Sequence, residues 1–239
     1  MTIGQGEVVG ASIREELLRT CGLLMEPGSV HEVRIPKTDR QGTISGYFDS
    51  VDALADAALQ YDGNVPAVYI TLNPCNPALL ARAANRLQSR AALTTSDPDI
   101  TCRRWLLLDC DPKRPAGISS TDQEHGQAIS IACGVWDELR SAGFPDPVVA
   151  DSGNGAHLLY RVDLPNTPES TELVKRLLRG VQERCGTDGI AVDGTVFNAA
   201  RITKLYGTFV MKGDNLPDRP HRRSRLLEIP ETMHVLRPQ

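Results

Sequence analysis

The sequence predicts a mixed α/β (α+β) fold in which an N-terminal α/β module packs on a ferredoxin-like, RNA-recognition-like module. Two observations predict it. From Arg103 onward the pattern reads strand, helix, strand, strand, helix, strand, which is the split β-α-β order of such a sheet. The residues before Arg103 carry helical and strand patterns of their own. We therefore expect one domain over residues 1–239, with modules over about 1–100 and about 101–230.

The first module alternates short helices with short strands. Ser50 precedes a helical pattern, and a serine hydroxyl at that position accepts hydrogen bonds from the free amides of the first turn. The run Asn-Pro-Cys-Asn-Pro after a buried-type strand ends that strand and opens a short helix. The expected elements are a helix over residues 13–24, strands over 30–35 and 43–48 joined by a turn over 38–42, a helix over 50–61, a strand over 67–72 and a short helix ending at 87.

The second module opens with the strand that ends in two aspartates. Thr121 and Glu124 form a capping box that starts the next helix, and Gly143 closes it. Pro168 suits the first turn of the following helix, where its missing N–H costs nothing. The expected elements are strands over 103–111, 148–150, 156–162, 190–192, 206–210 and 225–229, with the two helices after 121 and 167.

The composition narrows the class of protein. No apolar run approaches the roughly 20 residues that span a bilayer, and the N-terminus lacks a secretion signal pattern, so we expect a cytoplasmic protein without a membrane partner. Six scattered cysteines contain no C-x-x-C pair, which argues against a zinc ribbon and for reduced thiols. The net charge of −4 counts against a generic nucleic-acid coat protein but does not exclude a nucleic-acid enzyme, because the distribution of charge matters more than its sum.

Asp109 and Asp111 end an apolar strand two residues apart. Residues at this spacing point to one face of a strand, so the two carboxylates should project side by side while Cys110 points away. Two adjacent carboxylates repel each other, and hard oxygen ligands of this kind suit Mg²⁺ or Mn²⁺ better than zinc. The pair predicts a divalent metal site, although D-x-D also occurs in sugar transferases, phosphatases and structural turns.

The second candidate is the turn Ser152-Gly153-Asn154-Gly155 with His157 on the strand that follows. Glycines permit a close approach of backbone to a ligand, and amides in such a turn can form an anion-binding nest. His157 could donate to a phosphate there. The turn is not a Walker loop, because no Gly-Lys-Ser/Thr follows, and an ordinary hairpin turn beside a satisfied histidine is the alternative.

The third candidate is Asp193, which also ends an apolar strand. With Asp109 and Asp111 it would complete a two-metal site, and the Arg201 and Lys204 side chains would hold triphosphate oxygens. The alternative for Asp193 is a turn residue before Gly194. A basic stretch over residues 201–225 then holds two acidic side chains and seven basic ones, namely Arg201, Lys204, Lys212, Arg219, Arg222, Arg223 and Arg225.

Taken together, these motifs resemble the motif set of the archaeo-eukaryotic primase superfamily. Strand-Asp-x-Asp, Ser-Gly-x-Gly-x-His and apolar-Asp occur in that order, and the flanking runs RRWLLLDCDPKRPAGISSTD and DSGNGAHLLYRVDLP are similar to primase-polymerase domains of bacteria, phages and plasmids. Such domains are often fused to helicases or linked to CRISPR loci. The resemblance covers residues 30–230. Some relatives carry a zinc-binding element, and this chain has no cysteine or histidine spacing for one.

The resemblance implies a DNA primase-polymerase with its active site in the cleft between the modules. By it, Asp109, Asp111 and Asp193 bind two Mg²⁺ or Mn²⁺ ions. The substrates would be NTPs or dNTPs, and the partners a single-stranded DNA template and primer, with a helicase domain or another replication or CRISPR protein as a further possibility. The implied nucleotide-binding residues are Ser152, Gly153, Asn154, Gly155, His157, Asn198, Arg201 and Lys204.

Two rival functions stay open at the level of sequence. A nucleotide-sugar transferase would explain the D-x-D pair but neither His157 nor Asp193. A binding module that only holds single-stranded DNA or a nucleotide would use the same residues without turnover. The sequence leaves open the preference for ribo- or deoxynucleotides, de novo priming as against extension, the biological pathway and the oligomeric state.

Overall fold

The computed structural model describes residues 13–38, 41–185 and 189–237, and it confirms a mixed α+β fold built on antiparallel sheets. Asp39 and Arg40, in the predicted turn, lie outside the described residues. The N-terminal elements are α1 (Ile13–Leu24), β1 (His31–Thr38), β2 (Gly42–Phe48), α2 (Val51–Leu59), β3 (Tyr69–Thr71) and the 3-10 helices η1 (Pro77–Arg82) and η2 (Asp97–Asp99).

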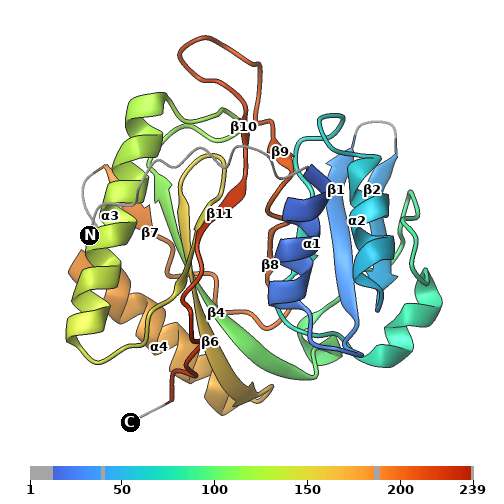
Figure 1. The fold of residues 1–239 in the computed structure, drawn as a ribbon, viewed down its shortest axis with the longest axis horizontal. Coiled ribbons are helices and arrows are strands. Elements are labelled where there is room, and N and C mark those ends of the chain that lie inside the picture. The colour runs from blue at the N-terminus through green and yellow to red at the C-terminus, as the bar shows by residue number, and fades with distance from the viewer. Residues whose placement is uncertain (1–12, 39–40, 186–188, 238–239) are drawn as a thin grey trace.

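The remaining elements form the larger sheet, its helices and the returning C-terminal strands (Figure 1). They are β4 (Cys102–Pro112), α3 (Asp122–Ser141), β5 (Val148–Asp151), β6 (Ala156–Pro165), α4 (Pro168–Cys185), β7 (Ile190–Val192), β8 (Ile202–Lys204), β9 (Phe209–Val210), β10 (Arg222–Arg223) and β11 (Arg225–Glu228).

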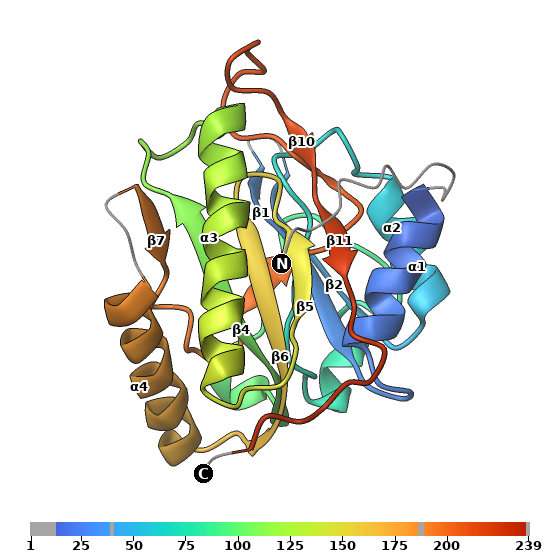
Figure 2. The same ribbon diagram turned by 60° about the vertical axis from the view of Figure 1, so that its left-hand side comes forward.

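Two main sheets organise the molecule. The larger has the order β11-β5-β6-β4-β7, and the smaller has the order β2-β1-β3-β8, with β9 and β10 as a separate pair. Helices α3 and α4 lie on the outer side of the larger sheet, so its other side faces the smaller sheet (Figures 1 and 2). Strand β8 pairs with β3, and a segment beyond residue 200 thereby completes the N-terminal sheet. The module bounds expected at about residues 100 and 230 stay a prediction.

Capping chemistry places several helix ends where the sequence predicts them. The Ser50 hydroxyl accepts from the Ala53 amide at the start of α2. Thr121 and Glu124 form the reciprocal capping box that opens α3. Each of these bonds satisfies an amide that has no partner inside its helix.

Residues 83–91 differ from the sequence-based expectation. The predicted helix to Leu87 is wrong beyond η1, because the following residues run beside β2 instead. The Tyr47 amide donates to the Ala83 carbonyl, and Ser45 and Gln88 exchange backbone hydrogen bonds. The pairing satisfies the backbone groups that a helix would otherwise have bonded internally.

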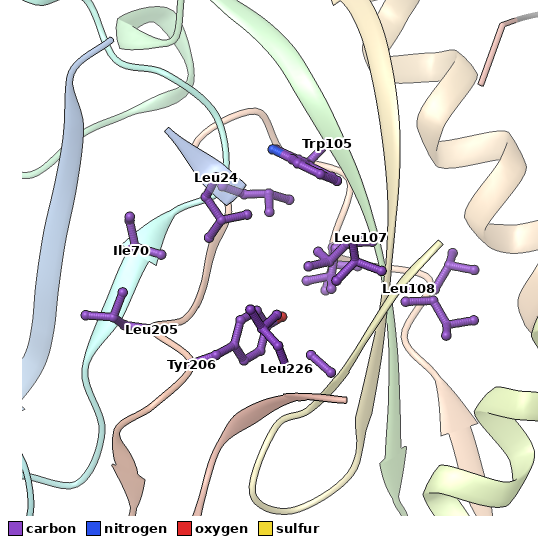
Figure 3. Packing of buried hydrophobic residues seen from close by; sticks show 14 of the residues in the cluster. Leu24, Ile70, Trp105, Leu107, Leu108, Leu205, Tyr206 and Leu226 are labelled. Carbon is purple, nitrogen blue, oxygen red and sulfur yellow. The ribbon is translucent and has the colours of Figure 1, made fainter. Parts of the chain in front are cut away.

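The core lies on both sides of the larger sheet. Trp105 and Leu107 point toward the smaller sheet, where Ile70 and Leu205 lie, whereas Leu108 points toward α3 (Figure 3). Among the described residues no helix is long and apolar enough to cross a membrane. All six cysteines are free thiols.

Candidate functional site

A pocket of about 290 Å³ lies between the two main sheets. Strands β4 and β6 contribute its acidic and imidazole groups, and strands β3 and β8 contribute aromatic and basic ones. Apolar burial continues away from the pocket on the same sheet face, so the polar groups gather at one end of an otherwise apolar interface. Its lining comprises Pro36, Tyr69, Leu107, Asp109, Asp111, Ser152, Asn154, His157, Val196, Arg201, Ile202, Thr203, Lys204 and Lys212.

Strand β4 brings Asp109 and Asp111 together in this pocket. Both line it, while Cys110 between them is fully buried. Their shared face follows from the alternation of side chains along a strand. The Asp111 carboxylate lies 3.2 Å from the Arg114 guanidinium and is 37 % exposed. Asp109 is paired in register with His157 on β6, and its Oδ1 lies 3.5 Å from His157 Nε2.

The charges around Asp109 favour its ionised form. Burial alone would raise the pKa of this carboxyl group, but its interaction with His157 and the charges of Lys204 and Lys212 outweigh burial and lower its pKa. Asp109 is therefore a carboxylate at neutral pH, available to a cation.

The turn after β5 lies directly against the end of β4. A Cβ on Gly155 would fall 2.2 Å from the Cys110 carbonyl oxygen and 2.8 Å from Asp111 Oδ1. Only glycine permits this approach. Gly153 has a φ of 86°, in the left-handed region that glycine adopts without strain. These two glycines let the turn carry the Ser152 and Asn154 side chains into the pocket.

The amides of this turn are bonded within the turn itself. The Gly153 amide donates to Asp151 Oδ1, the Gly155 amide donates to Ser152 Oγ, and the Ser152 amide donates to the Gly155 carbonyl. Three amides of the expected anion-binding nest are therefore already hydrogen-bonded within the protein. Asn154 Oδ1 accepts from the Ser120 amide, whereas Asn154 Nδ2 is buried without a hydrogen-bond partner among the described residues. This side chain, more than the backbone, offers a free donor.

His157 is almost completely buried and is held on its far side by a tyrosine. Its Nδ1 lies 2.7 Å from Tyr206 Oη, and Thr203 Oγ1 lies 3.2 Å from the same tyrosine oxygen. Sequence reasoning did not include Tyr206 or Thr203 in the site. No local signal points to them, because the contact joins strand β6 to a segment almost 50 residues later.

Three cations face the carboxylates across the pocket. Burial lowers the pKa of Lys204 to about 8, although the charges of Asp109 and Asp111 raise it. Burial also lowers the pKa of Lys212, which the sequence placed only within the basic stretch. Lys204 Nζ lies 2.5 Å from Tyr69 Oη. Arg201 donates from Nη2 to the Thr195 carbonyl at 3.2 Å, and its Nε is buried without a partner among the described residues.

Asp193 and Asn198 are not among the residues that line the pocket. The Asp193 amide donates to the Asp109 carbonyl, so Asp193, the residue that follows β7, lies beside Asp109 of β4. The Asp193 carboxylate, however, accepts from the Thr195 amide at 2.8 Å and from its hydroxyl at 2.6 Å. The Asn198 carbonyl accepts from the Arg201 amide. Within the described ranges, no three His, Cys, Asp or Glu side chains are grouped closely enough to hold a metal ion.

Much of the basic stretch is engaged in ion pairs outside the pocket. The guanidinium groups of Arg219, Arg222 and Arg223 each contact a carboxylate within 3 Å. Arg222 also donates to the Ser120 carbonyl, which ties the start of α3 to the C-terminal strands. Of the seven basic residues, Arg201, Lys204 and Lys212 line the pocket. The stretch thus contributes three cations to the site and uses others to hold the fold.

The pocket suits a divalent cation with a phosphate ligand. Magnesium in proteins commonly binds one or two carboxylates and completes its shell with water and substrate phosphates. Asp109 and Asp111 supply such a pair of oxygen ligands, and the cations opposite suit a polyphosphate. The donor set therefore fits Mg²⁺ or Mn²⁺ without a complete cage of protein ligands.

Comparison with known proteins finds similarity among solved structures. No protein-family model matches the chain, and no curated protein matches it. The primase-polymerase (AEP) domain of cyanophage S-2L matches with a TM-score of 0.49 and 13% identity, over 93% of this chain and 92% of that one. Primase RepB′ matches with a TM-score of 0.49 and 10% identity, over 90% of this chain and 56% of that one.

The polymerase domain of Mycobacterium tuberculosis ligase D, solved in complex with DNA, also matches. Its TM-score is 0.44 and its identity 16%, over 88% of this chain and 80% of that one. At these identities and TM-scores the matches assign no residue roles.

Proposed function

We propose that this protein is a DNA primase-polymerase, a nucleotidyltransferase that binds a metal-complexed nucleoside triphosphate in the pocket between its sheets. One observation carries the proposal. Two adjacent carboxylates, Asp109 and Asp111, share a single pocket with an imidazole and three cationic side chains. A metal–triphosphate complex needs both kinds of group, oxygen ligands for the cation and positive donors for the phosphates.

The chain's own residues act by positioning and by charge. Arg201, Lys204 and Lys212 bind and orient the triphosphate. The His157 imidazole and the side-chain Nδ2 of Asn154 donate hydrogen bonds to its oxygens. When bound, divalent ions would neutralise charge on the phosphates and favour ionisation of the attacking hydroxyl. In the proposed reaction the 3′-hydroxyl oxygen bonds to the α-phosphorus, the bond to the bridging oxygen breaks, pyrophosphate leaves and the hydroxyl proton passes to solvent. Such transfer needs no protein nucleophile.

Asp193 is proposed as a third carboxylate of the site. The proposal is supported by one backbone contact: the Asp193 amide, just past the end of β7, donates to the Asp109 carbonyl. Both Thr195 hydrogen bonds go to Asp193 Oδ1, so the carboxylate would bind a metal through Oδ2 or by exchange of those bonds. Asn198 meets Arg201 through its backbone carbonyl, so the proposed role of its side chain follows from the sequence resemblance.

The finer elements of the proposal extend the sequence resemblance. We infer an N-terminal α/β module and an RNA-recognition-like module with the active site in the cleft between them. The inferred partners are single-stranded DNA template and primer, and the inferred setting is replication or repair of a mobile element or a CRISPR-linked locus, with a helicase as a possible associate. Support comes from the pocket between the sheets and from the order of the three motifs.

The test is templated synthesis on unprimed single-stranded DNA with Mn²⁺ or Mg²⁺, using labelled NTPs and dNTPs in turn. We expect short products from the wild type, none from the Asp109→Ala/Asp111→Ala variant, and wild-type yield from Asp218→Asn, which alters an exposed aspartate outside the pocket. Extension of an added primer alone would indicate a polymerase that needs a partner for initiation. Products from the double-alanine variant would overturn the proposal.

A binding module is the second candidate, and the Asp193 contact favours it. With its carboxylate bonded to Thr195, the pocket has two acidic ligands, which is enough to hold a metal–nucleotide complex. Metal-dependent nucleotide binding without product in either assay format would establish that function. Turnover of a sugar nucleotide without template would instead indicate a D-x-D transferase.

A further inference from the structure

A closed cluster of polar groups stands behind His157, on the side away from Asp109. His157 Nδ1 lies 2.7 Å from Tyr206 Oη, and Thr203 Oγ1 lies 3.2 Å from that oxygen and 3.4 Å from Nδ1. Tyr206 is fully buried, and the two rings meet edge to face with centroids 5.8 Å apart. The hydrogen-bond partners that the structure shows for this buried hydroxyl, His157 and Thr203, both lie within the cluster.

The two ring nitrogens of His157 therefore face opposite environments. Nδ1 faces a hydroxyl, which can donate or accept, whereas Nε2 faces the Asp109 carboxylate at 3.5 Å, which can only accept. A neutral imidazole carries one proton. With the proton on Nδ1, the Nε2 lone pair would confront the carboxylate. With the proton on Nε2, the Tyr206 hydroxyl donates to Nδ1 and the N–H dipole points at Asp109.

We propose that Tyr206 is a positioning residue that fixes neutral His157 as the Nε2–H tautomer, so that the imidazole presents a hydrogen-bond donor to the pocket. The hydrogen bond on the far nitrogen of a histidine selects which nitrogen is free to act in this way. The tautomer itself follows from the cluster's geometry.

The consequence for substrate rests on the proposed function. A protonated Nε2 has no lone pair in the ring plane, so His157 neither ligates the metal nor accepts a proton from the attacking hydroxyl. It donates instead to an anionic oxygen, and the triphosphate of the incoming nucleotide provides one. Tyr206 thereby contributes to nucleotide affinity without touching the nucleotide.

The chain offers a matched control for this tyrosine. Tyr160 is also fully buried, but its hydroxyl has no hydrogen-bond partner among the described residues. It is paired in register with Leu106, whose side chain lines a cavity beside α3 and α4 and does not reach the candidate site. Tyr160→Phe and Tyr206→Phe remove the same atom from two buried rings, and only the second removes a hydrogen bond.

The direct experiment is nitrogen NMR of the His157 imidazole in the neutral state, assigned with a His157→Gln variant. We expect the wild type and Tyr160→Phe to carry the proton on Nε2. In Tyr206→Phe we expect a shifted Nδ1 resonance and a measurable share of the Nδ1–H form. A wild type protonated on Nδ1, or unchanged His157 resonances in Tyr206→Phe, would overturn the proposal. This readout needs no catalytic activity, so it stands or falls separately from the proposed function.

Kinetics supply the second readout. Losing the Tyr206 hydrogen bond should raise the KM for the nucleotide about fivefold and leave kcat within about twofold, because the lost contribution is that of one hydrogen bond. Tyr160→Phe should leave both constants unchanged. An unchanged KM in Tyr206→Phe, or an equal rise in both variants, would contradict a positioning role even if the enzyme makes primers.

Discussion

The two faces of strand β4 differ in what they cover. On one face Leu106, Leu108 and Cys110 are buried; Leu108 points toward α3 (Figure 3), and the alternation of side chains along the strand puts Leu106 and Cys110 on the same side. On the other face Trp105 and Leu107 continue the core, but the last residues are Asp109 and Asp111, which line the pocket. A single strand therefore carries core residues on one face and the proposed metal ligands on the other.

Because the two faces of β4 differ in this way, substitutions on one face should change stability and substitutions on the other should change ligand binding. The helix-covered face is apolar and buried, so a truncation there should lower the free energy of unfolding. The pocket face ends in charges that, among the described residues, no cage of protein ligands encloses, so a change there should weaken metal and nucleotide binding. Substitutions one residue apart can test this.

Asp109→Asn should have the largest effect on function. It keeps the shape of the side chain and removes the charge that the pocket cations favour. We expect synthesis to fall by about 10³-fold or more, the scale seen when an electrostatic group of a transfer site is removed. The melting temperature should stay within a few degrees, which circular dichroism would check. Full activity in this variant would remove Asp109 from the site.

Leu108→Ala should lower stability and leave nucleotide binding nearly unchanged. Leu108 is fully buried on the helix-covered face, and truncating such a leucine costs about 2–5 kcal/mol of unfolding free energy. Urea denaturation measures that loss, and calorimetry at a temperature where the variant is folded measures its nucleotide affinity. The account expects an affinity within about twofold of wild type. A large loss of nucleotide affinity with little loss of stability would contradict the assignment of different roles to the two faces of β4.

Asp193→Asn tests whether Asp193 takes part in metal binding beside Asp109 and Asp111. Its Oδ1 accepts from Thr195 and the residue does not line the pocket, so we expect its contribution to metal binding to be weaker than that of Asp109. We expect about a hundredfold loss of synthesis, smaller than for Asp109→Asn, with a raised Mn²⁺ requirement. A metal titration of activity distinguishes the two. Wild-type metal dependence would leave Asp193 as a turn residue.

The pH dependence of nucleotide binding is the smallest effect. Burial lowers the pKa of Lys204 to about 8, so above that pH the free protein must take up a proton to offer a charged amine. With one proton per amine, affinity for Mg²⁺–nucleotide should be about tenfold weaker at pH 9 than at pH 7. Because the pKa of Lys204 is lower in the folded protein than in the unfolded chain, its buried charge destabilises the fold below pH 8. This destabilisation decreases as the pH rises from 8 toward the ordinary pKa of lysine.

Lys204→Met provides the control for that titration. It should weaken binding at pH 7 and flatten the profile between pH 7 and pH 9. Because the variant removes a buried charge, its stability at pH 7 should not fall as far as its affinity does. A variant with the wild-type profile would place the titrating group elsewhere, with Lys212 the next candidate because burial lowers its pKa too.

The features that could be predicted from the sequence are the local ones. Alternation along β4 predicts that Asp109 and Asp111 share a face, and the glycines of the Ser152–Gly155 turn predict a tight turn before His157. The capping box of α3 follows from four residues. In each case the physical cause lies within a few positions of the residue concerned.

The remaining features depend on contacts between distant segments. Strand β8 is three residues long and exists through pairing with β3, some 130 positions earlier. Tyr206 reaches His157 only because β8 carries the chain back across the pocket face. The carboxylate of Asp193 could turn toward a metal or toward Thr195, and local spacing does not distinguish them.

The most direct test of the account is anomalous diffraction from crystals grown with Mn²⁺ and a non-hydrolysable nucleoside triphosphate. The account predicts a manganese peak bound by the Asp109 and Asp111 carboxylates, with the triphosphate lying against Arg201, Lys204 and His157. A nucleotide bound outside this pocket, or manganese absent from the two carboxylates while the nucleotide is bound, would contradict it.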